Sequence, residues 1–270
     1  LVASPFKAAG RPMGSGAQRP VMAPMRSPCG CCCLSIVCLV SIPGLLAGVE
    51  HALRARAPRL PVRGGDPCAC VPWKEAYTSG AATCGDGHEL RPVTALFVPK
   101  WLAVLLLGPE FCSNFYTALS GSACANVRFA DESERWDAGS WCYVSDECPI
   151  GSPANGSTNL RVKLCKRGQD DTLRDRTPEE LHRQAVAEDL DIGLFVKMAY
   201  PIDGQVKWPE SKAFLGQDPG VPPEATHPEV AERLRTLTDA GKPVILDSYD
   251  SHPPFAVLNG PKLWLISFNP

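Results

Sequence analysis

Hydrophobic residues in this chain gather in a few runs separated by polar, proline-rich sequence. The longest run, residues 29–49, contains no charged residue, follows Arg26 and precedes Glu50. A membrane-spanning helix needs about 20 apolar residues, whereas a cleavable signal peptide needs an apolar stretch of about 7 to 15. Because this run satisfies parts of both patterns, residues 26–49 are predicted to be a signal peptide or a signal anchor.

The flanks of this run leave its fate open. The small residues Ala47 and Gly48 favour cleavage, while Leu45 and Leu46 disfavour it. Arginines lie on both sides, so the excess of positive charge expected on the cytoplasmic side does not fix an orientation. Residues 50–65 are predicted to be a basic linker. Residues 1–25, rich in Gly, Pro, Ala and Ser, are predicted to be disordered or upstream sequence.

A second apolar run covers residues 95–107 and is interrupted by Pro99 and Lys100. It is too short to span a bilayer as a helix. We expect a buried strand or helix of the core here. The alternative is an exposed insertion that contacts a partner or a membrane.

The last hundred residues contain clear helix and strand signals. Thr177 and Glu180 form a capping box around a proline, which predicts a helix over 178–189. Further helices are expected over 192–199 and from 228 to a stop at Gly241, with irregular surface chain over 201–227. Strands are expected over 244–249, 255–258 and 262–268, with a hairpin turn at Asn259-Gly260.

Thirteen cysteines divide into two groups. Five lie in the leader, where they are expected to act as small apolar residues, with acylation of three of them as the alternative: Cys29, Cys31, Cys32, Cys33 and Cys38. The other eight follow the leader within about one hundred residues: Cys68, Cys70, Cys84, Cys112, Cys124, Cys142, Cys148 and Cys165. An even number after a secretory leader predicts four disulfides, whose pairing the sequence does not select.

Zinc is the competing interpretation of these cysteines. Cys68 and Cys70 are separated by one residue, and Cys142 and Cys148 by five, whereas structural zinc sites favour separations of two to four. We therefore predict no metal and no cofactor. The fold class expected is α+β: a small disulfide-rich domain over 66–168, followed by a cysteine-free region of helices and a β-hairpin over 169–270.

Aromatic residues accompany the cysteines: Trp73, Tyr116, Trp136, Trp141 and Tyr143. We expect their rings to pack on the disulfides, since small domains need such residues to complete a core. The alternative is an exposed platform for a carbohydrate or protein ligand. Asn155-Gly-Ser157 is a glycosylation sequon in a Ser/Gly/Pro-rich stretch, which predicts a glycan on Asn155.

Charge and motif content restrict the class of function. The formal net charge of −2 combines +7 over residues 1–64 with −9 over the remainder, which has no stripe of Lys or Arg, so nucleic-acid binding is not expected. No phosphate-binding glycine loop or serine-hydrolase elbow occurs. No catalytic residue is assigned. An enzyme of unrecognised class, with acid or base groups from Glu89, Asp247 or His252, remains an alternative.

Several short strings resemble the cysteine-rich secretory-type proteins of dinoflagellate algae. These strings are Cys68-Ala-Cys70-Val-Pro-Trp73, Cys84-Gly85, His88-Glu89-Leu90, Phe111-Cys112-Ser-Asn-Phe115-Tyr116, Cys124-Ala-Asn126, Trp141-Cys142-Tyr143-Val144, Thr177-Pro-Glu-Glu-Leu181, Asp189-Leu-Asp-Ile-Gly-Leu194 and His252-Pro-Pro. The resemblance covers residues 66–270 and implies no assigned activity. It also implies that residues 91–107 are an insertion.

These features together predict a protein of the secretory pathway, located outside the cell, at its surface or in an organelle lumen. We expect a secreted or membrane-tethered binding or structural protein with a protein or carbohydrate ligand. It would be held at a membrane through residues 29–49 if the leader is not cleaved. An accessory subunit of a membrane complex is a further alternative.

Overall fold

A computed structural model describes residues 6–8, 65–92, 99–129, 139–157, 159–215, 227–248 and 254–268. Helices and strands are both abundant and the disulfides gather near the start of the described chain, so the predicted α+β class is confirmed. The signal peptide or signal anchor predicted over 26–49 lies outside the described residues. Within the described ranges, no helix has the length and apolar content needed to cross a bilayer.

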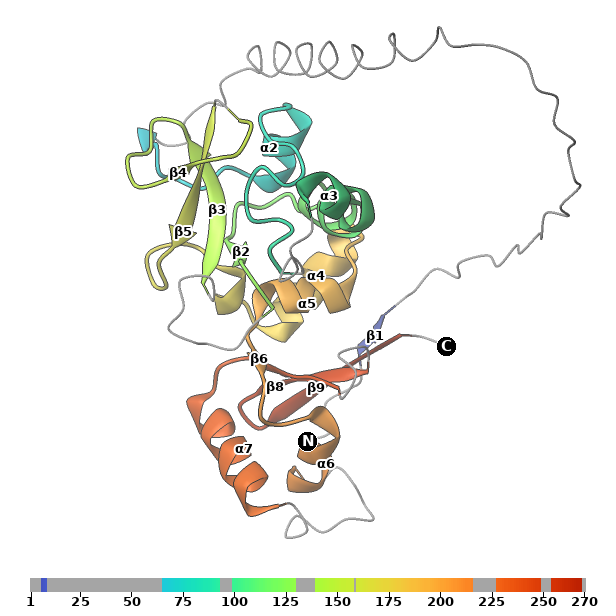
Figure 1. The fold of residues 1–270 in the computed structure, drawn as a ribbon. Helices are drawn as coiled ribbons and strands as arrows, with labels where there is room; N and C mark the ends of the chain where they lie inside the picture. Colours follow the sequence, from blue (N-terminus) through green and yellow to red (C-terminus); the bar gives the residue numbers. More distant parts are fainter. Residues whose placement is uncertain are drawn as a thin grey trace, which may run out of the picture.

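The disulfide-rich half contains a four-stranded antiparallel sheet in the order β2-β3-β5-β4, with helices on one side (Figure 1). Its strands are β2 (Ala125–Asn126), β3 (Ser140–Ser145), β4 (Ser152–Pro153) and β5 (Leu160–Cys165), and its helices are α2 (Trp73–Thr78), α3 (Lys100–Gly108) and the π-helix η2 (Pro109–Tyr116). Strand β3 is buried at every position but its last, which makes it the centre of this half.

Two helices connect this half to the next. Helix α4 (Pro178–Glu188) follows the 3-10 turn η4 (Leu173–Asp175), and its capping box between Thr177 and Glu180 is present as predicted. Helix α5 (Ile192–Ala199) begins at Asp191, whose carboxylate accepts a 2.7 Å hydrogen bond from the Leu194 amide. Seven of its eight residues are buried, because α5 lies between the two sheets (Figure 1).

The second sheet has five strands in the order β1-β9-β8-β7-β6. They are β1 (Phe6–Ala8), β6 (Ile202–Asp203), β7 (Val244–Leu246), β8 (Phe255–Asn259) and β9 (Lys262–Phe268). Helices α6 (Trp208–Phe214) and α7 (Pro228–Ala240) cover the face opposite α5. Helix α7 ends at Gly241 in the left-handed conformation, as its sequence predicts.

One hydrophobic core crosses the predicted boundary at residue 168. It contains buried residues of the disulfide-rich half, most of α5, and Phe255 and Ile266 from the second sheet. A smaller cluster on the other face of that sheet includes Leu234 of α7 and Leu246 of β7. The cysteine-free half is therefore stabilised both by its own small core and by packing against the bridged half.

Three details of the sequence prediction are corrected. Asn259 pairs with Lys262, so the hairpin turn is Gly260-Pro261, where glycine supplies the required positive φ of 56°. Chain expected to be irregular over 201–227 contains β6 and α6. Residues 6–8, expected to be disordered, form β1 because the edge of β9 offers free backbone donors and acceptors for parallel pairing.

Candidate functional site

The eight cysteines over residues 68–165 form four disulfides, which confirms the prediction and supplies the pairing that the sequence left open. The bridges are Cys68–Cys148, Cys70–Cys142, Cys84–Cys112 and Cys124–Cys165. The first two tie the segment before α2 to β3 and to the turn after it, Cys124–Cys165 joins the residue before β2 to β5, and Cys84–Cys112 joins the loop after α2 to η2. Four disulfides indicate an oxidising environment.

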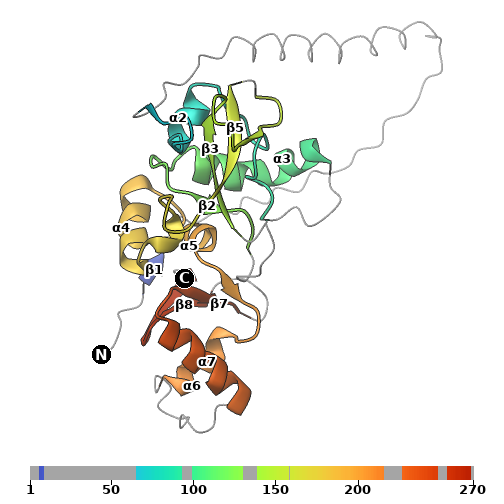
Figure 2. The same cartoon turned by 90° about the vertical axis from the view of Figure 1, so that its left-hand side faces the viewer.

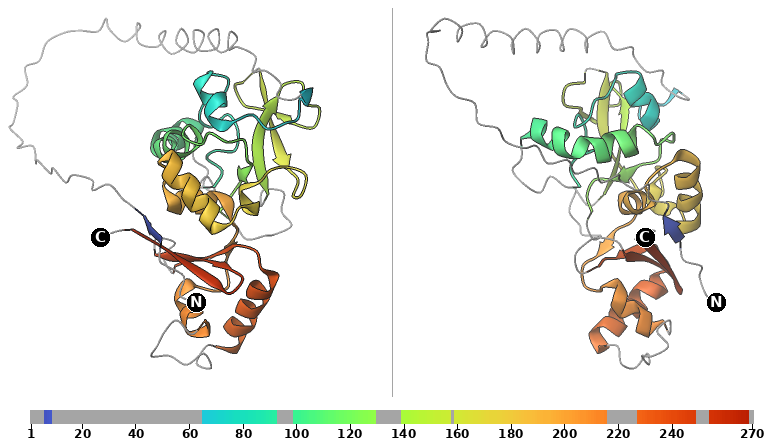
Figure 3. Two further views of the ribbon diagram at one scale, coloured as in Figure 1. Left: turned by 180° about the vertical axis from the view of Figure 1, so that it is seen from behind. Right: turned by 90° about the vertical axis from the view of Figure 1, so that its right-hand side faces the viewer.

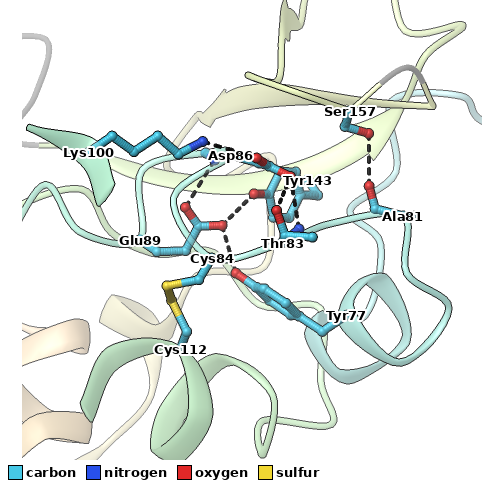
Figure 4. Close-up of polar contacts among 11 residues, drawn as sticks. Tyr77, Ala81, Thr83, Cys84, Asp86, Glu89, Lys100, Cys112, Tyr143 and Ser157 are labelled. Atoms are coloured by element: carbon cyan, nitrogen blue, oxygen red, sulfur yellow. Dashed lines mark hydrogen bonds and ion pairs between the residues drawn. A yellow bond between two sulfur atoms is a disulfide. The ribbon is translucent and has the colours of Figure 1, made fainter. Parts of the chain in front are cut away.

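A fully buried carboxyl group lies in the loop between α2 and α3, five residues after Cys84. Glu89 has no exposed surface, and its Oε1 accepts a 2.6 Å hydrogen bond from the Tyr77 hydroxyl and a short one from the Tyr143 hydroxyl (Figure 4). Its Oε2 accepts a 2.9 Å bond from the Gly87 amide. Burial raises the pKa of the Glu89 carboxyl, and these hydrogen bonds offset part of the shift.

Aromatic rings enclose this carboxyl. Trp73, Tyr116, Trp141 and Tyr143 all have zero exposure, and Trp73 contacts the other three with ring centroids 4.7 to 5.8 Å apart. Burial is also the main reason that the pKa of each of Tyr77, Tyr116 and Tyr143 is raised well above the usual value. The three hydroxyls therefore stay protonated, and those of Tyr77 and Tyr143 donate to Glu89.

The burial of these rings distinguishes between the two interpretations of the aromatic residues, core packing and an exposed ligand platform. Trp73, Tyr116, Trp141 and Tyr143 form the inside of the core, where small disulfide domains need them, so the alternative of exposed ligand contacts is wrong for these four. The fifth ring, Trp136, lies outside the described residues.

The turn before Glu89 holds helix α3. Asp86, only 2% exposed, accepts hydrogen bonds from the Thr83 amide at 2.9 Å, from the Thr83 hydroxyl at 2.8 Å and from Lys100 Nζ at 3.2 Å (Figure 4). Lys100 is the first residue of α3. A side chain on Gly85 would meet Lys100 and Val104, so α3 packs directly on this loop.

Helix α3 has two unlike faces. Val104 packs against the core, and Gly108 sits close to Cys84 Sγ. The opposite face exposes Trp101 at 67%, Leu105 at 66% and Leu106 at 65%. Trp101 and Leu105, four residues apart, are neighbours on the helix surface, and Leu106 extends the exposed face by about 100° around the helix. Helix α3 projects from the body of the molecule in Figures 2 and 3.

The expectation that the second apolar run is buried in the core is therefore wrong for the outer face of α3. Residues 93–98 lie outside the described residues. The sequence did carry a signal: the small residues Ala103 and Gly108, both buried, occupy one side of the helix among large apolar residues. Small residues permit close packing on that side, which leaves the large ones on the other.

Of the proposed acid and base groups, Glu89 and Asp247 lie in different halves of the described chain, Glu89 before α3 and Asp247 after β7. Glu89 is sealed from solvent, Asp247 is 5% exposed and its Oδ1 accepts a bond from the Ser248 amide, and His252 lies outside the described residues. His88, next to Glu89, packs its ring against Trp141. Desolvation and the neighbouring Arg91 lower the pKa of His88 to about 4, so it is neutral at physiological pH.

The predicted glycosylation site is accessible. Asn155 is exposed in a turn after β4, and Gly156 takes a positive φ of 81°. The Asn155 backbone amide donates to the Asp86 carbonyl at 2.7 Å, and the Ser157 hydroxyl donates to the Ala81 carbonyl at 2.8 Å. The sequon is thus anchored through its backbone while the Asn155 side chain faces solvent.

A small pocket of about 170 Å³ lies between β6, β7 and α7. Arg233 at its wall is held by Asp203, with Nε and Nη2 at 2.9 and 2.6 Å from the same carboxylate oxygen. Because Asp203 is buried and compensates this cation, the pair is structural; Lys242 is the other charged residue that lines the pocket.

In comparisons with known proteins, no protein-family model, no curated protein and no solved structure matches the chain.

Proposed function

We propose that this chain is an extracellular or lumenal binding protein, made on the secretory route, that rests on a lipid bilayer through the outer face of α3. The observation that carries the proposal is the exposure of Trp101, Leu105 and Leu106 on one projecting helix. Clustered exposed apolar side chains mark contact with a membrane or a partner, whereas isolated ones need no explanation.

The rigidity of the helix supports this role. The Cys84–Cys112 bridge, the Lys100–Asp86 ion pair and the packing of Gly85 against Val104 hold the inner face. A binding face that is already ordered loses little conformational entropy when it binds. The buried Glu89 cluster fixes the turn that carries Asp86, so it acts as a structural support for the binding face.

The residue types suit the boundary between headgroups and acyl chains. Tryptophan is enriched there because its ring is apolar and its N–H is polar. Burying a leucine side chain is worth roughly 1.5 to 3 kcal/mol, so Trp101, Leu105 and Leu106 would give reversible attachment only. Stable attachment normally requires a second signal.

The sequence supplies such a signal. Residues 29–49 form the uncharged run predicted to be a signal peptide or anchor, and fifteen residues separate it from Gly65, where the described chain resumes. Fifteen extended residues reach about 50 Å, so an uncleaved anchor would keep α3 beside the same bilayer. The four arginines of this linker, Arg54, Arg56, Arg59 and Arg63, would attract anionic headgroups.

Quenching of tryptophan fluorescence by brominated lipid tests the proposal. The full chain would be reconstituted in phosphatidylcholine/phosphatidylserine vesicles with brominated acyl chains. We expect a quenched component that disappears in Trp101→Phe and in the double variant Leu105→Glu/Leu106→Glu. Quenching unchanged in both would refute bilayer contact by α3.

The matched control is Val186→Glu on α4. Val186 is 71% exposed and also apolar, but it lies on a different helix. This variant adds one glutamate, half the charge change of the double variant, without touching α3, and we expect full quenching of Trp101 in it. Loss of quenching in the control would mean that any added surface charge detaches the protein, and the assignment to α3 would fail.

A further inference from the structure

Two of the four disulfides lie against each other. Cys70 Sγ is 3.6 Å from Cys124 Sγ, although these atoms belong to different bridges. The sulfur atoms of Cys70, Cys124, Cys142 and Cys165 all lie within 4.8 Å of one another. Among the described residues, no other set of three or more metal-ligating side chains gathers this closely.

These spacings fit a tetrahedral metal site. Zinc bound by four thiolates has Zn–S distances of about 2.3 Å, which places the sulfur atoms about 3.8 Å apart. Bringing the four sulfurs of this cluster to the corners of such a tetrahedron needs side-chain rotations and shifts of about an ångström. We propose that, in the thiol form of the chain, these four cysteines form a tetrathiolate zinc site that excludes the two disulfides.

The backbone holds the four cysteines in place independently of the sulfur bonds. Cys142 in β3 pairs with Lys163 in β5, and Cys165 lies two residues further along β5 on the same face. The β2–β3 register pairs Ala125 with Trp141, so its continuation places Cys124 opposite Cys142. These ladder hydrogen bonds do not depend on the oxidation state of the cysteines.

Further backbone bonds fix the remaining segments. The Cys124 amide donates to the Asp171 carbonyl at 2.9 Å, and its carbonyl accepts from the Leu173 amide at 3.0 Å. The Val71 amide donates to the Tyr143 carbonyl at 2.8 Å, which holds Cys70 beside β3. The four ligand positions are therefore organised in advance, as a tight metal site requires.

The surroundings also suit thiolate ligands. Cys124 and Cys142 have no exposed surface, which keeps water from the metal. Lys163, on the same face of the sheet, is 6% exposed and donates at 2.7 Å to both the Cys68 carbonyl and Asp170. Asp170 already pairs with this cation, so Lys163 brings hydrogen-bond donors rather than an uncompensated charge to this face.

The interconversion of the two forms balances as follows. Zinc binding displaces four thiol protons. A small-molecule disulfide can then oxidise the site: two protein S–S bonds form, two oxidant S–S bonds break, and four electrons pass from the cysteine sulfurs to the oxidant. The oxidant takes up four protons and leaves as four thiols, while Zn²⁺ dissociates.

Metal titration of the full chain in detergent tests this site. In every version, the five leader cysteines would be replaced by serine, so that they contribute no ligand. After anaerobic reduction and removal of reductant, we expect one Zn²⁺ per chain by native mass spectrometry, and a cobalt spectrum with the bands of a tetrahedral tetrathiolate. Zinc below one equivalent, or a cobalt spectrum without thiolate bands, would overturn the proposal.

Variants identify the ligands. Cys84→Ser/Cys112→Ser removes the bridge beside α3 and should retain full zinc binding, whereas Cys124→Ser should lose it. Because Cys124→Ser removes a core residue, Cys165→His is the second test. Histidine cannot form a disulfide with Cys124, but it can bind zinc. We therefore expect one zinc per chain and a cobalt spectrum typical of three sulfur ligands and one nitrogen ligand. Equal binding in Cys124→Ser, or loss in Cys165→His, would contradict the assignment. Neither result depends on the lipid contact of α3.

Discussion

The hydroxyl of Tyr77 donates a 2.6 Å hydrogen bond to the carboxyl group of Glu89, joining helix α2 to the turn that carries Asp86. Glu89 is fully buried, so its protonation is coupled to the stability of the turn. Because Asp86 also holds Lys100 of α3, the sealed carboxyl supports the exposed face without touching it.

Glu89 should make stability depend on pH. Its folded-state pKa is raised by burial, so its contribution is fully present below the unfolded value of about 4.3 and is lost as pH rises through the folded value. We expect the urea midpoint of the native protein to fall between pH 5 and pH 8 by more than that of Glu89→Gln. The control is Glu147→Gln at an exposed position, which should keep the native slope. Equal slopes in all three proteins would contradict the prediction.

Gly87 should tolerate no side chain. A Cβ there would lie 2.5 Å from the Trp141 ring and 2.8 Å from the Tyr143 hydroxyl, and both rings are locked in the core. Gly87→Ala is expected to lower the free energy of unfolding by about 1 to 3 kcal/mol, as overpacking does. Gly204→Ala, where the new Cβ meets nothing within 4 Å, should change it by less than about 0.5 kcal/mol. Chemical denaturation of both variants measures the difference.

The disulfides should differ in their contribution to stability. Cys84 and Cys112 are separated by 28 residues, and Cys68 and Cys148 by 80. The entropy of loop closure gives about 3.6 kcal/mol for the shorter loop and about 4.5 kcal/mol for the longer one. Removing the longer bridge with paired Cys→Ala substitutions should therefore lower the unfolding free energy by roughly 1 kcal/mol more than removing the shorter one. The opposite order in denaturation experiments would indicate residual structure in the unfolded chain.

Asn155 should carry a glycan when the chain is made in a eukaryotic secretory system. Its side chain is exposed, and the sequon is the only one in the sequence. Peptide N-glycosidase should reduce the mass of the native protein and leave Asn155→Gln unchanged. Asn159→Gln, four residues away and outside any sequon, should still shift. A native protein with no shift would argue against passage through the glycosylating compartment or against access to the sequon.

Local patterns in the sequence were sufficient for the elements that depend on near neighbours. The capping box at Thr177, the glycine stop at Gly241 and the β-branched and aromatic residues of β8 and β9 identify helices and strands because their causes lie within a few residues. The hairpin turn was displaced by one residue, since Asn259 and Gly260 both suit a turn and only strand pairing decides which is central.

The even cysteine count over residues 68–165 and the α+β class were determined by the sequence alone. The tertiary structure decided what connects distant segments: the pairing of Cys70 with Cys142, the burial of Trp141, the exposure of Trp101 and the contact of Cys70 with Cys124. The spacing of the cysteines argued against a zinc site, because spacing identifies only those sites whose ligands are close together in the sequence. The cluster draws its four sulfurs from separate segments, which only the strand register brings together.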